Sequence, residues 1–252
     1  MTLFSWLILS YACAAGLIFV IGSIIVIARW IFLPKGTSGT YLGYPYLLTF
    51  PGNTSRASAF KNMLKRIFLF SSLKDDPYLR TVTMTFHWSL WIVIAAHADL
   101  VLMPYFASIG ISEQTMEMIG TYLGTSLAVI MVAAGFLLLL RRITDKYVRR
   151  ISSTADYFSI LLIIAIGISG IYMRVALPSL FAYNQVSPYI HSIFTLSPIN
   201  IPFQWPFIIH FFLVCTLLIY FPCSKFMHPY SFLTNPTMYS IFHPGEANET
   251  KD

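Results

Sequence analysis

Histidines in apolar segments are the residues of this chain best suited to chemistry. Four of its six histidines lie there as two pairs, His87 with His97 and His210 with His228. An imidazole in hydrocarbon is costly unless it binds a ligand or is hydrogen-bonded. Histidine is a common axial ligand of haem iron, and facing helices can supply ligands from both sides. Two pairs therefore indicate two haem groups within a membrane.

The segments that must position these histidines are long and apolar. Hydrophobic residues make up 57% of the 252-residue chain and charged residues only 10%, which excludes a soluble domain of this size. A stretch of about 20 apolar residues crosses a hydrocarbon core of about 30 Å. The sequence therefore predicts an all-α integral membrane protein with a bundle of five transmembrane helices, at about residues 3–31, 82–106, 115–140, 155–177 and 203–227.

Basic residues are distributed unevenly between the two ends of these helices. With five helices, nearly all of them fall on one side, and Arg174 is the only one on the other. Since cytoplasmic loops carry an excess of lysine and arginine, we expect the N-terminus outside and the C-terminus in the cytoplasm of a multi-pass protein of the cell membrane. The net charge of +6 is explained by this topology and does not indicate nucleic-acid binding.

Residues outside the five helices form one sizeable segment and a tail. At about residues 56–73, apolar residues recur at helical spacing with basic residues between them, which predicts an amphipathic helix. Such a helix could lie on anionic lipid headgroups or form a docking surface for a cytoplasmic partner. Residues 244–252 are expected to be a disordered tail, which leaves residues 1–243 as a single membrane domain. His191 and His243 are expected at the surface.

The cysteines exclude one class of cofactor. Cys13, Cys215 and Cys223 lie in or beside the membrane helices without the spacing of a metal-binding motif. The chain is therefore not expected to hold an iron–sulfur cluster or a zinc site, and packing is the expected role of these residues. If electrons leave the protein for a soluble acceptor, another subunit must carry the clusters.

The order of the helices predicts which histidines face each other. The second helix would run outward and the fifth would run back, so His97 is expected opposite His210 near the outer face. By the same argument, His87 is expected opposite His228 near the inner face. The distances along the two helices differ. A helix rises roughly 15 Å over the ten residues from His87 to His97, and roughly 27 Å over the 18 residues from His210 to His228. A bend at Pro222 would place His228 beyond the straight part of the helix.

Two other functions must be weighed against haem binding. A proton-coupled transporter, or another non-haem membrane protein, could use the histidines with Asp99 as a proton or ion path. Such transporters more often show broken helices in two related halves, which the sequence lacks. A desaturase-type metal enzyme needs histidines clustered about one helical turn apart or a carboxylate-rich metal site. Single membrane histidines are often packing or relay residues, but antiparallel pairs favour iron ligands.

Several segments resemble the membrane gamma subunit of respiratory nitrate reductase, a five-helix dihaem cytochrome b. The likeness covers about residues 86–230 and includes the histidine order and the segments GFLLLLRR, STADYFSILLIIAIGISG and FIIHFFLVCTLLIYFPCSKFMH. The long basic inner loop and the segment KRIFLFSSLKDDPYLRTVTMTFHWSLW look more like the relatives that partner a heterodisulfide-reductase-like iron–sulfur subunit. These relatives are the membrane cytochrome of the sulfite-reduction-linked complex, which the segment resembles above all, and the membrane subunit of heterodisulfide reductase.

The resemblance implies a subunit of a quinol:acceptor oxidoreductase in anaerobic respiration, with the chemistry on the final substrate in other subunits. It implies two haem b groups, one held by His97 and His210 and one by His87 and His228. Menaquinone or another quinone would exchange electrons at an outer site beside the first haem. Electrons would pass through the second haem to a cytoplasmic iron–sulfur partner that is heterodisulfide-reductase-like. Further membrane and extracytoplasmic subunits could belong to the same complex.

An outer quinol site also needs a proton acceptor, because oxidation of a quinol releases two protons with its two electrons. Asp99 lies two residues beyond His97 and is the only acidic residue well within a predicted helix. It is our candidate, with a hydrogen bond to a histidine or to Arg174 as the alternative role. Glu113 and Glu117, at the outer mouth of the third helix, are expected to be solvated, with proton exit as the alternative.

The chain departs from the family pattern near this point. The nitrate reductase relatives carry a basic residue here that assists quinol binding, whereas this chain has Met116, Glu117 and Met118. The resemblance therefore does not supply a basic quinol-binding residue for this chain.

Overall fold

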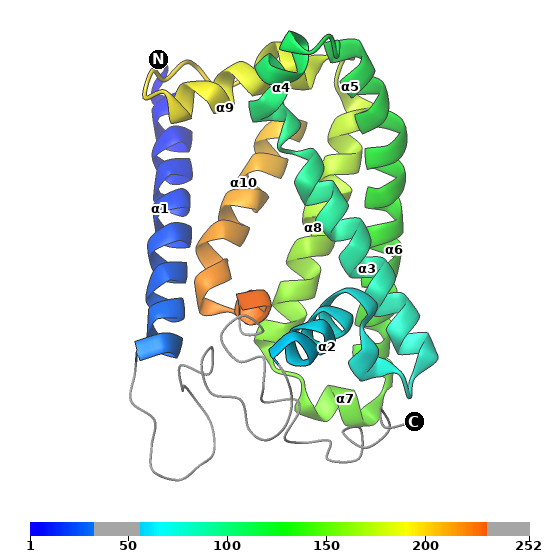
Figure 1. Ribbon diagram of the computed structural model, residues 1–252. Coiled ribbons are helices and arrows are strands. Elements are labelled where there is room, and N and C mark those ends of the chain that lie inside the picture. The colour runs from blue at the N-terminus through cyan, green and yellow to red at the C-terminus, as the bar shows by residue number, and fades with distance from the viewer. Residues whose placement is uncertain (33–55, 231–252) are drawn as a thin grey trace. The chain divides into compact units, whose positions relative to one another are not determined.

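The computed structural model describes residues 1–32 and 56–230 (Figure 1). This described part is helical and contains no strand. Its α-helices are α1 (Leu3–Phe32), α2 (Arg56–Leu69), α3 (Pro77–Ala96), α4 (Asp99–Ser108), α5 (Glu113–Ile119), α6 (Thr125–Thr144), α7 (Lys146–Ile151), α8 (Thr154–Ala176), α9 (Ser187–Phe194) and α10 (Trp205–Tyr220). Three short 3-10 or π-helical turns in the described residues lie between these helices, η1 (Ser71–Leu73), η2 (Gly120–Gly124) and η3 (Ala182–Val186), and two follow α10, η4 (Phe221–Cys223) and η5 (Lys225–Met227).

The chain forms two compact units. Unit 1 consists of Met1–Gly16 and Thr81–Ile219. Unit 2 consists of the described residues within Leu17–Arg80 and Tyr220–Asp252. His243 and the tail 244–252, for which we predicted surface exposure and disorder, lie outside the described residues.

Within residues 1–32 and 56–230, four helical stretches are each long and apolar enough to cross a membrane, namely Leu3–Arg29, Glu113–Thr144, Thr154–Ala176 and Trp205–Cys223. The pair α3 and α4 would be a fifth span if the two together form one, although they are bent by 58° at the break between them. The all-α membrane architecture predicted from composition is therefore confirmed, and the protein is a multi-pass membrane protein.

The second predicted helix, residues 82–106, is not continuous. The amides of His97 and Ala98 bond to the carbonyls of Ile94 and Ala95, three residues earlier. This i to i+3 pattern is tighter than that of an α-helix and marks the break between α3 and α4. The break places His97 at the junction of two helices rather than in the middle of one.

Proline shapes the second half of this bent pair. Pro104 lies inside α4 and has no amide to donate to the carbonyl of Leu100. The hydroxyl of Ser187, at the start of α9, donates to that carbonyl over 2.6 Å. The lost helical bond is thus replaced by a tertiary one, which ties α9 to α4.

The α6 and α8 helices lie side by side in unit 1 (Figure 1). Glycine permits this packing, since a Cβ atom at Gly167 would lie 2.5 Å from Cγ2 of Val132. At Gly135, an added Cβ would lie 3.1 Å from Cγ1 of Ile164. Small residues at such positions allow helix backbones to approach closely in a membrane. The packing holds α8 firmly where it carries part of the candidate site.

Helix α10 is shorter than the predicted fifth helix, which was expected to reach residue 227. It ends at Tyr220, and Pro222 lies in the following 3-10 turn, where its missing amide cannot continue an α-helix. The interruption predicted at Pro222 is therefore confirmed, and the straight rise of roughly 27 Å between His210 and His228 does not apply. Ten residues separate His210 from the end of the helix, the same number that separates His87 from His97.

Helix α2 and the turn η1 of unit 2 lie in the segment for which we predicted an amphipathic helix. Met63 is buried, whereas Lys61 and Lys65 are exposed. Phe60 and Phe68 are also exposed. The two interpretations of this surface, lipid headgroups or a cytoplasmic partner, stay predictions.

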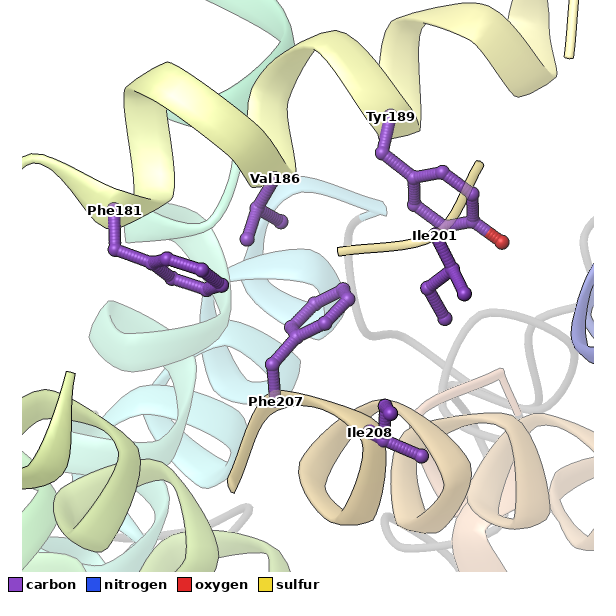
Figure 2. Packing of buried hydrophobic residues seen from close by; sticks show 6 residues of the cluster. All are labelled: Phe181, Val186, Tyr189, Ile201, Phe207 and Ile208. Carbon is purple, nitrogen blue, oxygen red and sulfur yellow. The ribbon is translucent and has the colours of Figure 1, made fainter. Parts of the chain in front are cut away.

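An apolar cluster of unit 1 joins the η3–α9 region to α10. Figure 2 shows Phe181, Val186 and Tyr189 facing the α10 residues Phe207 and Ile208, with Ile201 beside them. The first turn of α1 is bound to the same region, because the amide of Ile201 donates to the Ser5 hydroxyl over 3.3 Å. These contacts fix the start of α10, the helix that carries His210.

Candidate functional site

His97 and His210 are brought together in unit 1, as the sequence predicted. Their ring centroids are 6.2 Å apart and their planes differ by 16°. One ring comes from the break between α3 and α4, the other from α10. Bonds from a metal to imidazole nitrogen are about 2.0–2.1 Å, so two such nitrogens on one ion lie about 4 Å apart and the ring centres farther. The observed separation is compatible with one iron between the rings.

The hydrogen bond of His97 defines its tautomer. Its Nδ1 lies 2.7 Å from the carbonyl oxygen of Val93, one turn earlier in α3. A carbonyl oxygen can only accept, so Nδ1 carries the proton and donates. Nε2 is then left with its lone pair, which is the form of imidazole that binds a metal.

His210 has the same tautomer for a different reason. The hydroxyl of Ser169 donates to the carbonyl of Ile166 over 2.9 Å and lies 3.0 Å from Nδ1 of His210. Having used its hydrogen, this hydroxyl accepts from Nδ1, and Nε2 keeps its lone pair. The ring is buried, and α8 is the helix that orients it.

A glycine of α8 makes room for the His210 ring. A Cβ atom at Gly170 would lie 3.1 Å from Cε1 and 3.4 Å from Nδ1 of that ring. Neither Ser169 nor Gly170 was predicted to be a site residue. A Ser–Gly pair inside an apolar helix is the signal that could have indicated them, because small and hydroxyl residues mark close helix contacts in membranes.

The other two histidines show the same local pattern. In α3, Nδ1 of His87 donates to the Thr83 carbonyl over 2.8 Å. In unit 2, Nδ1 of His228 donates to the Lys225 carbonyl over 2.8 Å, just after η5. His87 and His228 belong to different units, and their assignment to one haem stays a prediction.

Asp99 has a partner that the sequence did not predict. Its Oδ2 accepts a hydrogen bond of 2.8 Å from the hydroxyl of Tyr183, in η3. The donor of this hydrogen bond is therefore a tyrosine, and not a histidine or Arg174, which we had named as alternative partners of Asp99. Burial, and next the bond to Asp99, raise the pKa of Tyr183 well above its ordinary value of 10.0, so the phenol remains a donor at physiological pH.

Glu117 is not the solvated residue that we expected. Its carboxylate forms an ion pair of 2.9 Å with Arg174 of α8, and its side chain is only 12% exposed. A Cβ atom at Gly120 would lie 3.0 Å from Nη2 of Arg174, so this glycine leaves space for the guanidinium. Glu113 is exposed, as predicted. The segment Met116–Met118 contains no basic residue. Arg174 of α8 supplies a basic side chain there instead, through its ion pair with Glu117.

The remaining candidate residues behave as follows. His191 is exposed, as predicted. Cys215 is buried, and Cys13 and Cys223 are exposed; all three are free thiols. Among residues 1–32 and 56–230, no group of three or more histidine, cysteine or acidic side chains is arranged to hold a metal ion.

Three known proteins that are similar to this chain are subunits of oxidoreductases. An Hdr-like menaquinol oxidoreductase cytochrome b-like subunit from Archaeoglobus fulgidus is 30% identical over 87% of this chain and 75% of its own length. The protein of the same name from Archaeoglobus profundus is 26% identical over 87% of this chain and 74% of its own length. The nitrate reductase gamma chain of Bacillus subtilis is 25% identical over 64% of this chain and 76% of its own length.

These relatives are subunits of oxidoreductases, which supports an electron-transfer role for this protein. The family model of the nitrate reductase gamma subunit matches residues 55–244, a range that contains all four of the paired histidines. The resemblance seen in the sequence is confirmed. The chain belongs to the nitrate reductase gamma subunit family.

Proposed function

We propose that this protein is a dihaem b-type cytochrome subunit of a membrane respiratory complex. It exchanges electrons between the quinone pool, at an outer site, and a cytoplasmic iron–sulfur partner subunit. The observation that carries the proposal is the pair formed by His97 and His210. Two nearly parallel imidazoles from facing helices, each with its Nε2 lone pair available, are suited to bind one haem iron from both sides.

The residues around this pair fit a haem. Gly170 leaves space against the His210 ring, and Ser169 fixes the orientation of that ring. From their order along the chain, we assign His87 and His228 to a second haem. When bound, the haems supply one-electron carriers between a two-electron quinol and a one-electron iron–sulfur acceptor.

The proposed sidedness rests on charge and chain order. If α3 and α4 form one bent span, the protein has five spans, with its N-terminus outside and its C-terminus in the cytoplasm. The end of unit 1 that holds α4 and α9 then faces outward. The names of the Archaeoglobus relatives support menaquinol as the quinol and an Hdr-like complex as the setting.

The chain itself supplies the acid–base chemistry at the outer site. Oxidation of a quinol releases two electrons and two protons, and the protons need an acceptor close to the electron acceptor. Asp99 follows His97 by two residues at the start of α4. We assign it the role of proton acceptor, with Tyr183 holding its carboxylate in place.

The Asp99→Asn variant tests this assignment. Removing a positioned base should slow reduction of the protein by quinol roughly 10²–10⁴-fold, because the amide cannot take the proton. Haem content and reduction by dithionite should not change, since neither depends on the carboxylate. Stopped-flow absorbance after mixing with menadiol measures the rate. Reduction of the Asp99→Asn variant by menadiol at the wild-type rate would exclude Asp99 as the acceptor.

The function as a whole is tested on the full-length protein in lipid nanodiscs. We expect the spectrum of a b-type cytochrome after reduction with dithionite, and partial reduction by menadiol alone. Reduction by menadiol that is then passed to the co-purified iron–sulfur partner would support the complete electron path. A proton-coupled transporter would instead be colourless, and that result would reject the proposal.

A further inference from the structure

Four polar side chains from four helical segments of unit 1 form two bonded pairs: Tyr183 of η3 with Asp99 of α4, and Arg174 of α8 with Glu117 of α5. The hydrogen bond from Tyr183 to Asp99 is 2.8 Å long, and the contact from Arg174 to Glu117 is 2.9 Å long. The charges of Glu117 and Arg174 also act on the Tyr183 phenol.

Only one side of the Asp99 carboxylate is occupied within the described part of the chain. Tyr183 donates to Oδ2, and among the described residues no hydrogen bond is made to Oδ1. An ionised carboxylate can accept bonds on both oxygens but can donate none. Asp99 is partly buried and follows His97 by two residues, so this oxygen is suited to a ligand that brings a hydroxyl donor.

We infer that Tyr183 is a positioning residue for quinol binding, which holds Asp99 so that its free Oδ1 accepts a hydrogen bond from a hydroquinone hydroxyl. This inference rests on the proposed function and adds a selectivity to it. A hydroquinone donates from its hydroxyl groups, whereas the carbonyl groups of a quinone only accept. The site therefore favours the reduced form over the oxidised form, and Tyr183 maintains that preference.

The competing explanation is that Tyr183 only docks η3 against α4. A matched control separates the two, because Ser187 makes the other hydrogen bond between the same regions, to the Leu100 carbonyl over 2.6 Å, without touching Asp99. A second control is Tyr189, a fully buried tyrosine nearby whose hydroxyl has no hydrogen-bond partner among the described residues. If Tyr183 only docks η3, removing the Ser187 hydroxyl should weaken menadiol binding as much as removing the Tyr183 hydroxyl.

The experiment compares Tyr183→Phe, Ser187→Ala and Tyr189→Phe in the full-length protein. Dissociation constants are measured by anaerobic equilibrium dialysis, for menadiol with dithionite-reduced protein and for menadione with oxidised protein, each against the wild type. Tyr183→Phe should weaken menadiol binding about tenfold, as expected for a weakened bond to a charged group, and leave menadione binding and haem content unchanged. In steady-state assays it should raise KM more than it lowers kcat. The two control variants should match the wild type.

A second variant keeps the inference testable if Tyr183→Phe does not accumulate. Asp99→Asn keeps an oxygen for Tyr183 but presents an NH₂ group in place of Oδ1, so it should lose the preference for menadiol and bind menadione at least as well as the wild type. Unchanged menadiol binding in Tyr183→Phe, an equal loss in Ser187→Ala, or a retained menadiol preference in Asp99→Asn would each overturn the inference. A wild-type protein without haem would reject the proposed function instead.

Discussion

Replacing either His97 or His210 with alanine is expected to halve the haem content and to abolish reduction of the protein by quinol. Each ring supplies one of the two axial ligands, and the rings face each other at 6.2 Å. Removing one ring leaves a single imidazole opposite an alanine in an apolar region, which cannot hold a six-coordinate iron. Both variants should therefore lose the same haem, and with it the electron acceptor of the outer site.

The pyridine haemochrome assay measures the haem content, and menadiol reduction measures the function. His191→Ala is the matched control, since His191 is exposed and lies outside the candidate spans. It should keep the full haem content and rate. If the His97 and His210 variants retained all of their haem, or lost different haems as judged by their reduced spectra, these two residues would not form one ligand pair.

Replacing His87 or His228 is expected to remove the other haem while menadiol still reduces the first. In each of these histidines Nδ1 donates to a backbone carbonyl, which leaves Nε2 in the metal-binding form. The variants should accept electrons from menadiol at the outer site but fail to deliver them to the iron–sulfur partner. Stopped-flow absorbance, with and without the partner subunit, separates these two steps.

Combining substitutions checks this pairing further. A His87→Ala, His228→Ala double variant should lose no more haem than either single variant, because both residues serve one iron. By contrast, a His87→Ala, His97→Ala double variant should lose all haem. Full electron transfer to the partner in either single variant would contradict the assignment of these residues to the second haem.

Features that depend on local composition were predictable from the sequence. The length and apolarity of the segments predicted the membrane helices, since the hydrocarbon core imposes both. The helical spacing of residues 56–73 likewise predicted α2. The juxtaposition of His97 with His210 followed from the antiparallel order of two helices alone. Such features need no knowledge of which side chains meet across the fold.

Features that depend on tertiary contacts were not predictable. The bond from Tyr183 to Asp99 joins residues 84 positions apart, and the ion pair from Arg174 to Glu117 joins residues 57 apart. No spacing rule connects such pairs. The break at His97 was also missed, because no proline or glycine stands there to signal it, and Pro104 lies further along the chain. The interruption near Pro222, by contrast, was predicted from the proline, although the apolar run continues past the end of α10 at Tyr220.

The most direct test of this account is the ratio of haem b to protein in the full-length chain, isolated from its native membrane in mild detergent. The pyridine haemochrome assay, with protein quantified by amino-acid analysis, should give two haem b groups per chain. Material that is intact and natively isolated but yields no extractable haem would contradict the claim that the paired histidines are iron ligands.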